Sequence, residues 1–241
     1  MNILITGASS GIGRAVAAHL LDKGWEVGLL ARSRDALEDL ANGRDKALVL
    51  EADVTDPAAV EAAFDAHVAR FGRIDVLFNN AGIFGKAAPI DEIDLDTWHQ
   101  VVSVNLNGMF YCARAAFARM RRQAPQGGRI INNGSISAHV PRDGSVCYTT
   151  TKHAITGMTR TLSLDGRAFN IACGQIDIGN ARTPMVEDQI YRANASGKNP
   201  DATMDVRNVA EAVEFMATRD LEANVQFMTV MATTMPYIGR G

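Results

Sequence analysis

Residues 6–13 read Thr-Gly-Ala-Ser-Ser-Gly-Ile-Gly and directly follow the short apolar run Ile3-Leu4-Ile5. Such a run predicts a buried strand, and the glycines after it predict a tight turn that opens into a helix. Backbone amides and the helix dipole favour an anion at this kind of turn. The stretch therefore predicts a phosphate-binding turn, and a tight strand-to-helix turn without a ligand is the alternative.

The glycines Gly7, Gly11 and Gly13 are spaced Gly-x-x-x-Gly-x-Gly, which differs from the commoner Gly-x-Gly-x-x-Gly of dinucleotide sites. The stretch is not a P-loop either, because neither Gly-Lys pair of the sequence is followed by serine or threonine. Its position favours a ligand, since the first strand-to-helix turn of an open parallel sheet is where dinucleotides bind.

The end of the second expected strand indicates which dinucleotide fits. A dinucleotide site usually has an acidic residue there, about 20 positions after the glycines, which accepts a hydrogen bond from the adenosine ribose. Here Leu30 is followed by Ala31-Arg32-Ser33-Arg34, without a carboxylate. A guanidinium pairs bidentately with a 2′-phosphate, so Arg32 predicts NADP(H) as the cofactor. The alternative is that both arginines are only solvated charges that open the next helix, and this explanation fits Arg34 better than Arg32.

Apolar runs alternate with helical patterns along most of the chain. We expect strands at 2–6, 25–30, 46–51, 74–78, 128–133, 169–174 and 226–231, and helices at about 11–22, 34–42, 57–71, 97–122, 148–165 and 207–218. Strands rich in Val, Ile and Leu between helices imply βαβ units and a parallel sheet covered on both faces. The predicted fold is α/β: a single doubly wound Rossmann-type parallel sheet of about seven strands. Residues 1–241 are expected to form one domain, with 178–206 as a substrate or lid loop.

Composition excludes several other classes of protein. The 241 residues are 47% hydrophobic and 21% charged, and the net charge of −3 offers no basic field for nucleic acid or an anionic membrane. Three widely spaced cysteines argue against a disulfide framework. No apolar stretch approaches the roughly 18 residues of a membrane span, and the first residues lack the pattern of a signal peptide. We therefore expect a cytoplasmic protein, with neither a nucleic-acid nor a membrane partner.

Tyr148 and Lys152 stand at positions i and i+4 of an expected helix and so share one face. The pair alone is a weak signal, but Ser135 ends a buried strand 13 residues earlier and Asn105 interrupts an otherwise apolar helix. An ammonium about 4 Å from a phenol, at an effective dielectric near 20, contributes roughly 4 kcal/mol, or about three pKa units. Lys152 is therefore expected to lower the pKa of Tyr148 from its ordinary value near ~10.

Taken together, these motifs resemble the short-chain dehydrogenase/reductase family over nearly the whole length and in the right order. The resemblance implies that Asn105, Ser135, Tyr148 and Lys152 are the catalytic tetrad. Tyr148 would exchange a proton with a carbonyl or alcohol oxygen, Ser135 would bond that oxygen, and Asn105 would keep a water for the proton relay. The expected cofactor-binding residues, from the residues and the resemblance together, are Gly7, Ser9, Ser10, Gly11, Ile12, Gly13, Arg32, Asp53, Val54, Asn80, Ala81, Gly82, Tyr148, Lys152, Gly174 and Ile176.

Some positions depart from the family pattern. Where the family usually has Pro-Gly after the sixth strand, this chain has Cys173-Gly174. Ile178 stands where the family often has a threonine. The residue before Ser135 is Gly134, where serine is common, and the last strand lacks an Asp-Gly-Gly ending. None of these departures removes the acid–base residues.

The sequence thus predicts an oxidoreductase that transfers hydride between NADP(H) and a small carbonyl or alcohol substrate. A non-catalytic NADP(H)-binding regulatory protein of the same fold is the alternative. Metal catalysis has little support, because neither His-Glu-x-x-His nor paired Cys-x-x-Cys occurs. Apolar residues surround the helix 98–117 on nearly every side, which favours a homodimer or homotetramer; cover by the helix at 148–165 is the alternative.

Overall fold

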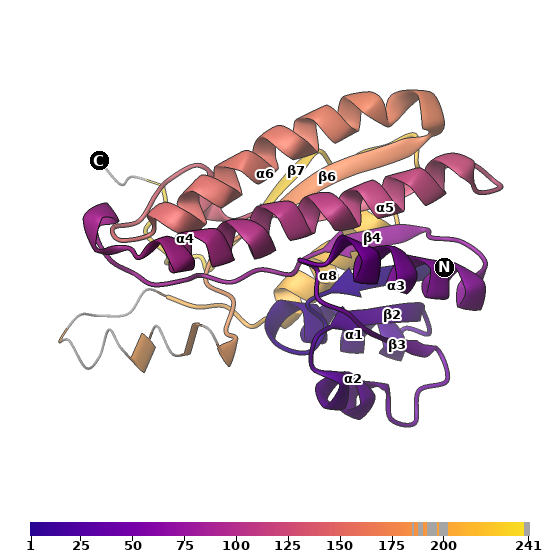
Figure 1. The fold of residues 1–241 in the computed structure, drawn as a ribbon, viewed down its shortest axis with the longest axis horizontal. Coiled ribbons are helices and arrows are strands. Elements are labelled where there is room, and N and C mark those ends of the chain that lie inside the picture. Colours follow the sequence, from indigo (N-terminus) through magenta and orange to yellow (C-terminus); the bar gives the residue numbers. More distant parts are fainter. Residues whose placement is uncertain (185, 188–189, 192–196, 198–201, 239–241) are drawn as a thin grey trace.

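A computed structural model of the chain describes residues 1–184, 186–187, 190–191, 197 and 202–238. Within these residues one parallel sheet of seven strands has the order β3-β2-β1-β4-β5-β6-β7. The strands are β1 (Asn2–Thr6), β2 (Glu26–Ala31), β3 (Ala47–Glu51), β4 (Val76–Asn79), β5 (Gly128–Asn133), β6 (Ile171–Ile178) and β7 (Phe227–Val230). The predicted doubly wound α/β fold is confirmed (Figure 1).

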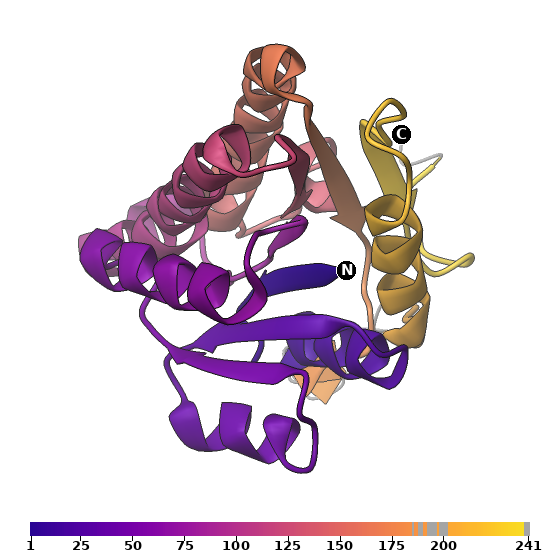
Figure 2. The same cartoon turned by 90° about the vertical axis from the view of Figure 1, so that its right-hand side faces the viewer.

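Helices cover both faces of this sheet (Figure 2). They are α1 (Gly11–Asp22), α2 (Arg34–Ala41), α3 (Pro57–Phe71), α4 (Leu95–Val102), α5 (Met109–Arg122), α6 (Val146–Asp165) and α8 (Arg207–Ala217). Successive side chains of a strand point to opposite faces, so Ile3 and Ile5 pack in the core with α1 and α8 while Leu4 packs in the core with α3 and α5. The continuous apolar runs of the strands follow from this burial on both faces.

The strand order reverses between β1 and β4, which are neighbours in the sheet although two strands separate them in sequence. From this point β2 and β3 extend the sheet in one direction, and β5, β6 and β7 extend it in the other. In open parallel sheets ligands bind beyond the carboxyl ends of the strands at such a reversal. The residues that follow β1, β4 and β5 are therefore placed together.

Two elements differ from the sequence-based prediction. The expected helix 97–122 is α4 and α5 joined by a π-helical turn at Ser103–Gly108. The expected strand 169–174 is β6, which continues to Ile178 because the polar side chains of Gln175 and Asp177 are buried and hydrogen-bonded. Part of the expected lid loop 178–206 lies outside the described residues, so its role stays a prediction.

No helix in the described ranges is both long enough and apolar enough to cross a membrane. The same residues contain no group of three or more His, Cys, Asp or Glu side chains arranged to hold a metal ion. The three cysteines, Cys112, Cys147 and Cys173, are buried free thiols.

Candidate active site

The turn between β1 and α1 has the backbone geometry that its glycines predict. Gly7 and Gly11 have φ angles of +68° and +54°, in the left-handed region that favours glycine. At Gly13 the requirement is space, because an added Cβ would overlap the Gly7 carbonyl oxygen and would lie 2.7 Å from the Asn80 amide nitrogen. The first turn of α1 is therefore packed directly against the end of β1.

This turn fits a phosphate group. Ser10 is the N-cap residue of α1, and its side chain makes no capping hydrogen bond. The first amides of a helix have no intrahelical partner and point along the positive end of the helix dipole. Amide donors and partial positive charge at Gly11 and Ile12 thus face the cleft that these residues line.

A line of hydrogen bonds connects this turn with α6. The Asn80 backbone amide donates to Thr6 Oγ1 at 2.8 Å, and Asn80 Nδ2 donates to the Thr6 carbonyl at 2.8 Å. Asn80 Oδ1 accepts from Asn133 Nδ2 at 2.8 Å, and the Asn133 carbonyl accepts from Lys152 Nζ at 2.7 Å. The ends of β1, β4 and β5 are therefore held in fixed positions relative to Lys152.

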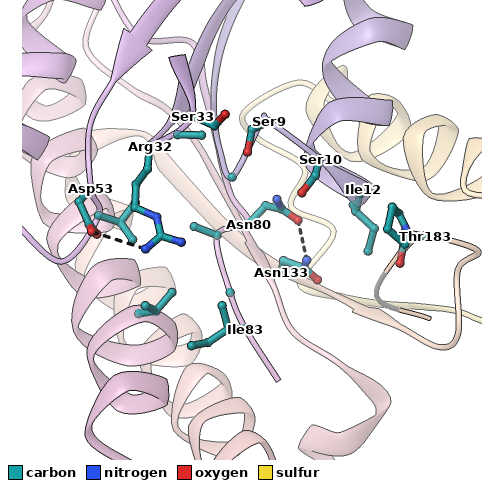
Figure 3. A pocket seen from close by; sticks show the side chains of 18 of the residues that line it. Ser9, Ser10, Ile12, Arg32, Ser33, Asp53, Asn80, Ile83, Asn133 and Thr183 are labelled. Carbon is teal, nitrogen blue, oxygen red and sulfur yellow. Dashed lines mark hydrogen bonds and ion pairs between the residues drawn. The ribbon is translucent and has the colours of Figure 1, made fainter. Parts of the chain in front are cut away.

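A cleft of about 760 Å³ lies at these strand ends and has Lys152 in its wall. Figure 3 shows Ser10, Arg32 and Asn133 around it. Most of the expected cofactor-binding residues line it: Gly7, Ser9, Ser10, Gly11, Ile12, Arg32, Asp53, Val54, Asn80, Ala81, Gly82, Tyr148 and Lys152. It is also lined by residues for which we made no such prediction: Ala31, Ser33, Ala52, Ile83, Val104, Asn133, Thr183 and Pro184. Gly13 does not line the cleft but packs against Gly7 and Asn80, which do line it.

Arg32 lies in the wall of the cleft beside β2 and β3. Its side chain is 72% exposed, and Nη1 is 4.0 Å from Asp53 Oδ2 (Figure 3). Arg34 is differently engaged, because it contacts Glu38 at 2.7 Å and Glu51 at 3.4 Å. Of the two arginines, Arg32 alone lines the cleft within the described residues.

Tyr148 and Lys152 lie one turn apart on α6, with Lys152 Nζ 5.5 Å from the centre of the Tyr148 ring. Burial lowers the pKa of Lys152 to about 8, and Asp177 partly opposes this shift. Burial also raises the pKa of Tyr148, against a lowering by its hydrogen bond with Ser135. In the chain alone the net shift of the Tyr148 pKa is therefore upward, whereas we expected a net lowering, because desolvation of the phenolate outweighs the hydrogen bond with Ser135.

Ser135 follows β5 and caps a short 3₁₀ helix at Ile136–Ala138. Its Oγ accepts a hydrogen bond from the Ser137 backbone amide at 3.1 Å, and the hydrogen bond with Tyr148 places the two hydroxyl groups together. Ser135 is buried, with 5% of its surface exposed. The structure thus brings together Ser135, Tyr148 and Lys152, as the sequence predicts.

Asn105 lies in the π-helical turn between α4 and α5 and is fully buried. Its Oδ1 accepts from the Ile83 amide at 2.8 Å, and its Nδ2 donates to the Ile83 carbonyl at 2.8 Å and to Thr151 Oγ1 at 3.2 Å. These bonds hold the segment after β4 against α6. The water-holding role that the resemblance implies for Asn105 stays a prediction.

Gly174 and Ile176 are placed differently from our expectation. Both lie inside β6 and neither lines the cleft, although Ile176 pairs in the sheet with Asn133, which does line it. A Cβ on Gly174 would overlap the Val225 carbonyl oxygen, so packing explains this glycine. The segment that does reach the cleft from beyond β6 carries Thr183 and Pro184. We expected the strand to end at residue 174, four residues before its observed end, and cofactor contact by Gly174 and Ile176 stays a prediction.

Comparison with known proteins agrees with this geometry. Residues 1–193 match the family model described as short chain dehydrogenase. The chain is 33% identical to levodione reductase of Leifsonia aquatica over 98% of its own length and 92% of that protein. Among solved structures it resembles a 3-ketoacyl-(acyl-carrier-protein) reductase from Brucella melitensis complexed with NADH, at 25% identity and a TM-score of 0.86 over 97% of both chains. It also resembles the closed form of serine dehydrogenase complexed with NADP⁺, at 25% identity and a TM-score of 0.90 over 100% of this chain and 98% of the other.

The packing of the glycine turn leads to a test with a matched control. Gly13→Ala is expected to lower the free energy of unfolding by roughly 1–3 kcal/mol, because the new methyl group overpacks against Gly7 and Asn80. Gly157→Ala, in the exposed interior of α6 with no atom within 4 Å of the new Cβ, should instead stabilise by about 0.5–1 kcal/mol. Urea denaturation of the two variants checks both signs, and a neutral Gly13→Ala would contradict the packing argument.

Proposed function

Because this chain belongs to the short-chain dehydrogenase family, we propose that it is an NADP(H)-preferring enzyme in which Tyr148 is the general acid and base. At the coarser level the chain is an oxidoreductase of hydroxyl or carbonyl substrates that uses a nicotinamide cofactor. One observation carries the finer proposal. The cleft extends from a turn that fits an anion to the partly buried Tyr148 and the buried Lys152.

The residues of the cleft fit a dinucleotide laid along the strand ends. The amides at Gly11 and Ile12 would hold the pyrophosphate, and Asp53 and Val54 would contact the adenine end. Arg32 would pair with the 2′-phosphate of NADP(H). At the other end Lys152 would hold the nicotinamide ribose, beside Tyr148.

The proposed reaction needs a proton donor where the carbonyl oxygen lies. When bound, the nicotinamide supplies the hydride in reduction or accepts it in oxidation. Burial raises the pKa of Tyr148, so the phenol is protonated at neutral pH and can donate to the carbonyl oxygen. Ser135 would hydrogen-bond the same oxygen. The Lys152 ammonium would stabilise the phenolate that remains, and its pKa of about 8 leaves it mostly charged at pH 7.

The proposed single domain spans residues 1–241, with a small-molecule substrate bound beside Ser135 and Tyr148. The name of one relative gives levodione as its substrate, so cyclic diketones are reasonable first probes for this chain. A purified sample should be assayed with NADPH and NADH against a panel of a cyclic diketone, an aromatic ketone, a 2-oxo acid and a 3-oxoacyl thioester.

Arg32→Ala tests the cofactor preference. Loss of a hydrogen bond to a charged group costs roughly 1.5–3 kcal/mol, so NADPH affinity should fall about 10- to 150-fold while NADH affinity stays within threefold. Arg34→Ala is the matched control, because Arg34 is held by Glu38 and Glu51 outside the wall of the cleft. Calorimetry with both cofactors measures the effect. Equal losses for NADPH and NADH in Arg32→Ala would contradict the assignment.

Tyr148→Phe tests the proton donor. The ring remains, so NADPH affinity should change little, while single-turnover hydride transfer should fall by at least ~10²–10⁴-fold. In the parent, carbonyl reduction requires the phenol and should be lost as pH rises through the Tyr148 pKa, whereas alcohol oxidation requires the phenolate and should rise. Tyr111→Phe, on α5, is the control. Reduction by Tyr148→Phe at the parent's rate would mean that another group donates the proton.

Lys152→Ala should give a different result from Tyr148→Phe. Loss of the ammonium should weaken NADPH binding and shift the pH–rate profile of the residual activity upward, because the phenolate loses its cationic neighbour. If Lys152→Ala binds NADPH like the parent and keeps the parent's pH profile, Lys152 neither holds the cofactor ribose nor stabilises the phenolate.

We also propose that the outer face of α5 and α6 binds a second copy of the chain. A groove of about 510 Å³ lies there, lined by Phe110, Phe117, Met158 and Leu162 among others. Phe110 is 51% exposed, so α6 covers only part of the apolar surface of α5. Exposed apolar patches of this kind are typical of subunit interfaces.

Light scattering at micromolar concentration should therefore give a dimer or tetramer. Phe110→Glu places a charge in the groove and should shift the protein toward monomer. Ile90→Glu, at a residue that is 73% exposed and outside the groove, is the control and should leave the assembly unchanged. A parent protein that is only monomeric would refute this proposal.

A further inference from the structure

A buried carboxylate lies directly behind Ser135. Asp177, on β6, is only 1% exposed. Its Oδ1 accepts hydrogen bonds from the Ser135 backbone amide at 2.9 Å and from Gln175 Nε2 at 2.7 Å. Its Oδ2 lies 2.8 Å from His139 Nε2. A buried charge is costly unless it is paired and hydrogen-bonded, and here both oxygens of the carboxylate have partners.

The two oxygens hold the two ends of one short segment. Ser135 begins the turn that follows β5, and His139 ends the 3₁₀ helix within that turn. Oδ1 binds the first residue through its backbone, and Oδ2 binds the last through its side chain. The Asp177 side chain alone thus connects both ends of the segment 135–139 to β6.

Gly134 provides the space that this arrangement needs. A Cβ on Gly134 would overlap Asp177 Oδ1 and would lie 2.6 Å from Gln175 Nε2. The Gly134 φ angle is outside the left-handed region, so space and not backbone conformation explains the glycine. The serine that the family resemblance suggests before Ser135 could not coexist with the carboxylate in this position. Gly134 and Asp177 therefore form a matched pair.

The Asp177 carboxylate fixes the backbone of Ser135, whose hydroxyl must be positioned accurately if it is to bond the reacting oxygen. The Ser135 hydroxyl bonds Tyr148 and accepts from the Ser137 amide, so its orientation depends on the backbone of the turn. Asp177 also raises the pKa values of both Tyr148 and Lys152, which places its charge within electrostatic reach of the reacting groups. Because an error of about 1 Å in placing a reacting group can cost 10²-fold in rate, the anchoring of this turn matters for catalysis.

We propose that Asp177 is a positioning residue of the active site, which fixes Ser135 through its backbone amide and closes the segment 135–139 through His139. This inference rests on the proposed function, in which Ser135 hydrogen-bonds the reacting oxygen. Asp177 acts through Ser135 and does not itself touch the substrate.

A double-mutant cycle with Ser135 separates positioning from general damage to the fold. Asp177→Ala removes both acceptors and should lower single-turnover hydride transfer, from NADPH to the fastest ketone of the panel, about 10- to 100-fold. In the Ser135→Ala background the same change should cost less than about threefold, because residues that act as a unit are non-additive. Asp177→Asn keeps one acceptor oxygen and should be intermediate, and it carries the cycle if Asp177→Ala does not fold.

Equal losses in both backgrounds, or no loss in the parent, would overturn the inference. A different result would overturn the proposed function: Ser135→Ala itself reducing the ketone at the parent's rate. Asp75→Asn is the matched control, because Asp75 Oδ2 also accepts a backbone amide, from Asn2 at 2.9 Å, but at the amino end of β4. It should leave hydride transfer within about threefold of the parent.

Hydrogen exchange of the chain without cofactor or substrate gives a readout that is independent of activity. The Ser135 amide should be protected in the parent, and its exchange should accelerate at least about tenfold in Asp177→Ala or Asp177→Asn while the amides of α1 and α3 keep their rates. Unchanged protection of Ser135, or a uniform loss across the chain, would show that Asp177 does not hold this turn specifically.

Discussion

Asn80, which follows β4, makes hydrogen bonds to the ends of the two neighbouring strands, β1 and β5. The geometry of the whole site depends on these bonds. Asn80 bonds the end of β1 through Thr6 and the end of β5 through Asn133, whose carbonyl then holds Lys152. Its amide nitrogen also lies within 3.0 Å of the positions that a Cβ on Gly7 or Gly13 would take. One side chain thus connects the proposed phosphate end of the cleft with its proposed catalytic end. Asn80 is partly buried, and its loss would leave its hydrogen-bond partners at both ends unpaired.

At the proposed catalytic end, burial shifts the pKa values of both Tyr148 and Lys152. Lys152 is buried with a carbonyl partner, and burial lowers its pKa to about 8. Burial also raises the pKa of Tyr148, so the chain alone holds a neutral phenol beside a mostly charged ammonium. This arrangement suits proton donation from Tyr148 to a carbonyl oxygen. The Lys152 ammonium would then act mainly by stabilising the phenolate that remains. Asp177 completes the set as a buried anion on the side of Ser135.

Much of this could be predicted from the sequence because local patterns determine it. Apolar runs gave all seven strands, and the Pro57 start and Gly72 end of α3 follow ordinary capping rules. The spacing of Tyr148 and Lys152 determines that they share a face of α6. The length of β6 was missed because Gln175 and Asp177 look like loop residues until their tertiary partners are known. Thr183 was missed for the same reason, since its place in the cleft depends on where β6 ends. The break between α4 and α5 was also missed, because the bonds of Asn105 to Ile83 and Thr151 are tertiary.

The central claim is that the cleft brings a nicotinamide cofactor and a carbonyl substrate together for direct hydride transfer beside Tyr148. The most direct measurement uses NADPH that carries deuterium at the transferable position of the nicotinamide, together with the ketone panel, and follows the label by NMR. The account predicts that the alcohol product carries the deuterium on its carbinol carbon, with one stereochemistry at that carbon. Binding of NADPH without transfer to any ketone of the panel would contradict it and would favour a regulatory protein that uses the same fold.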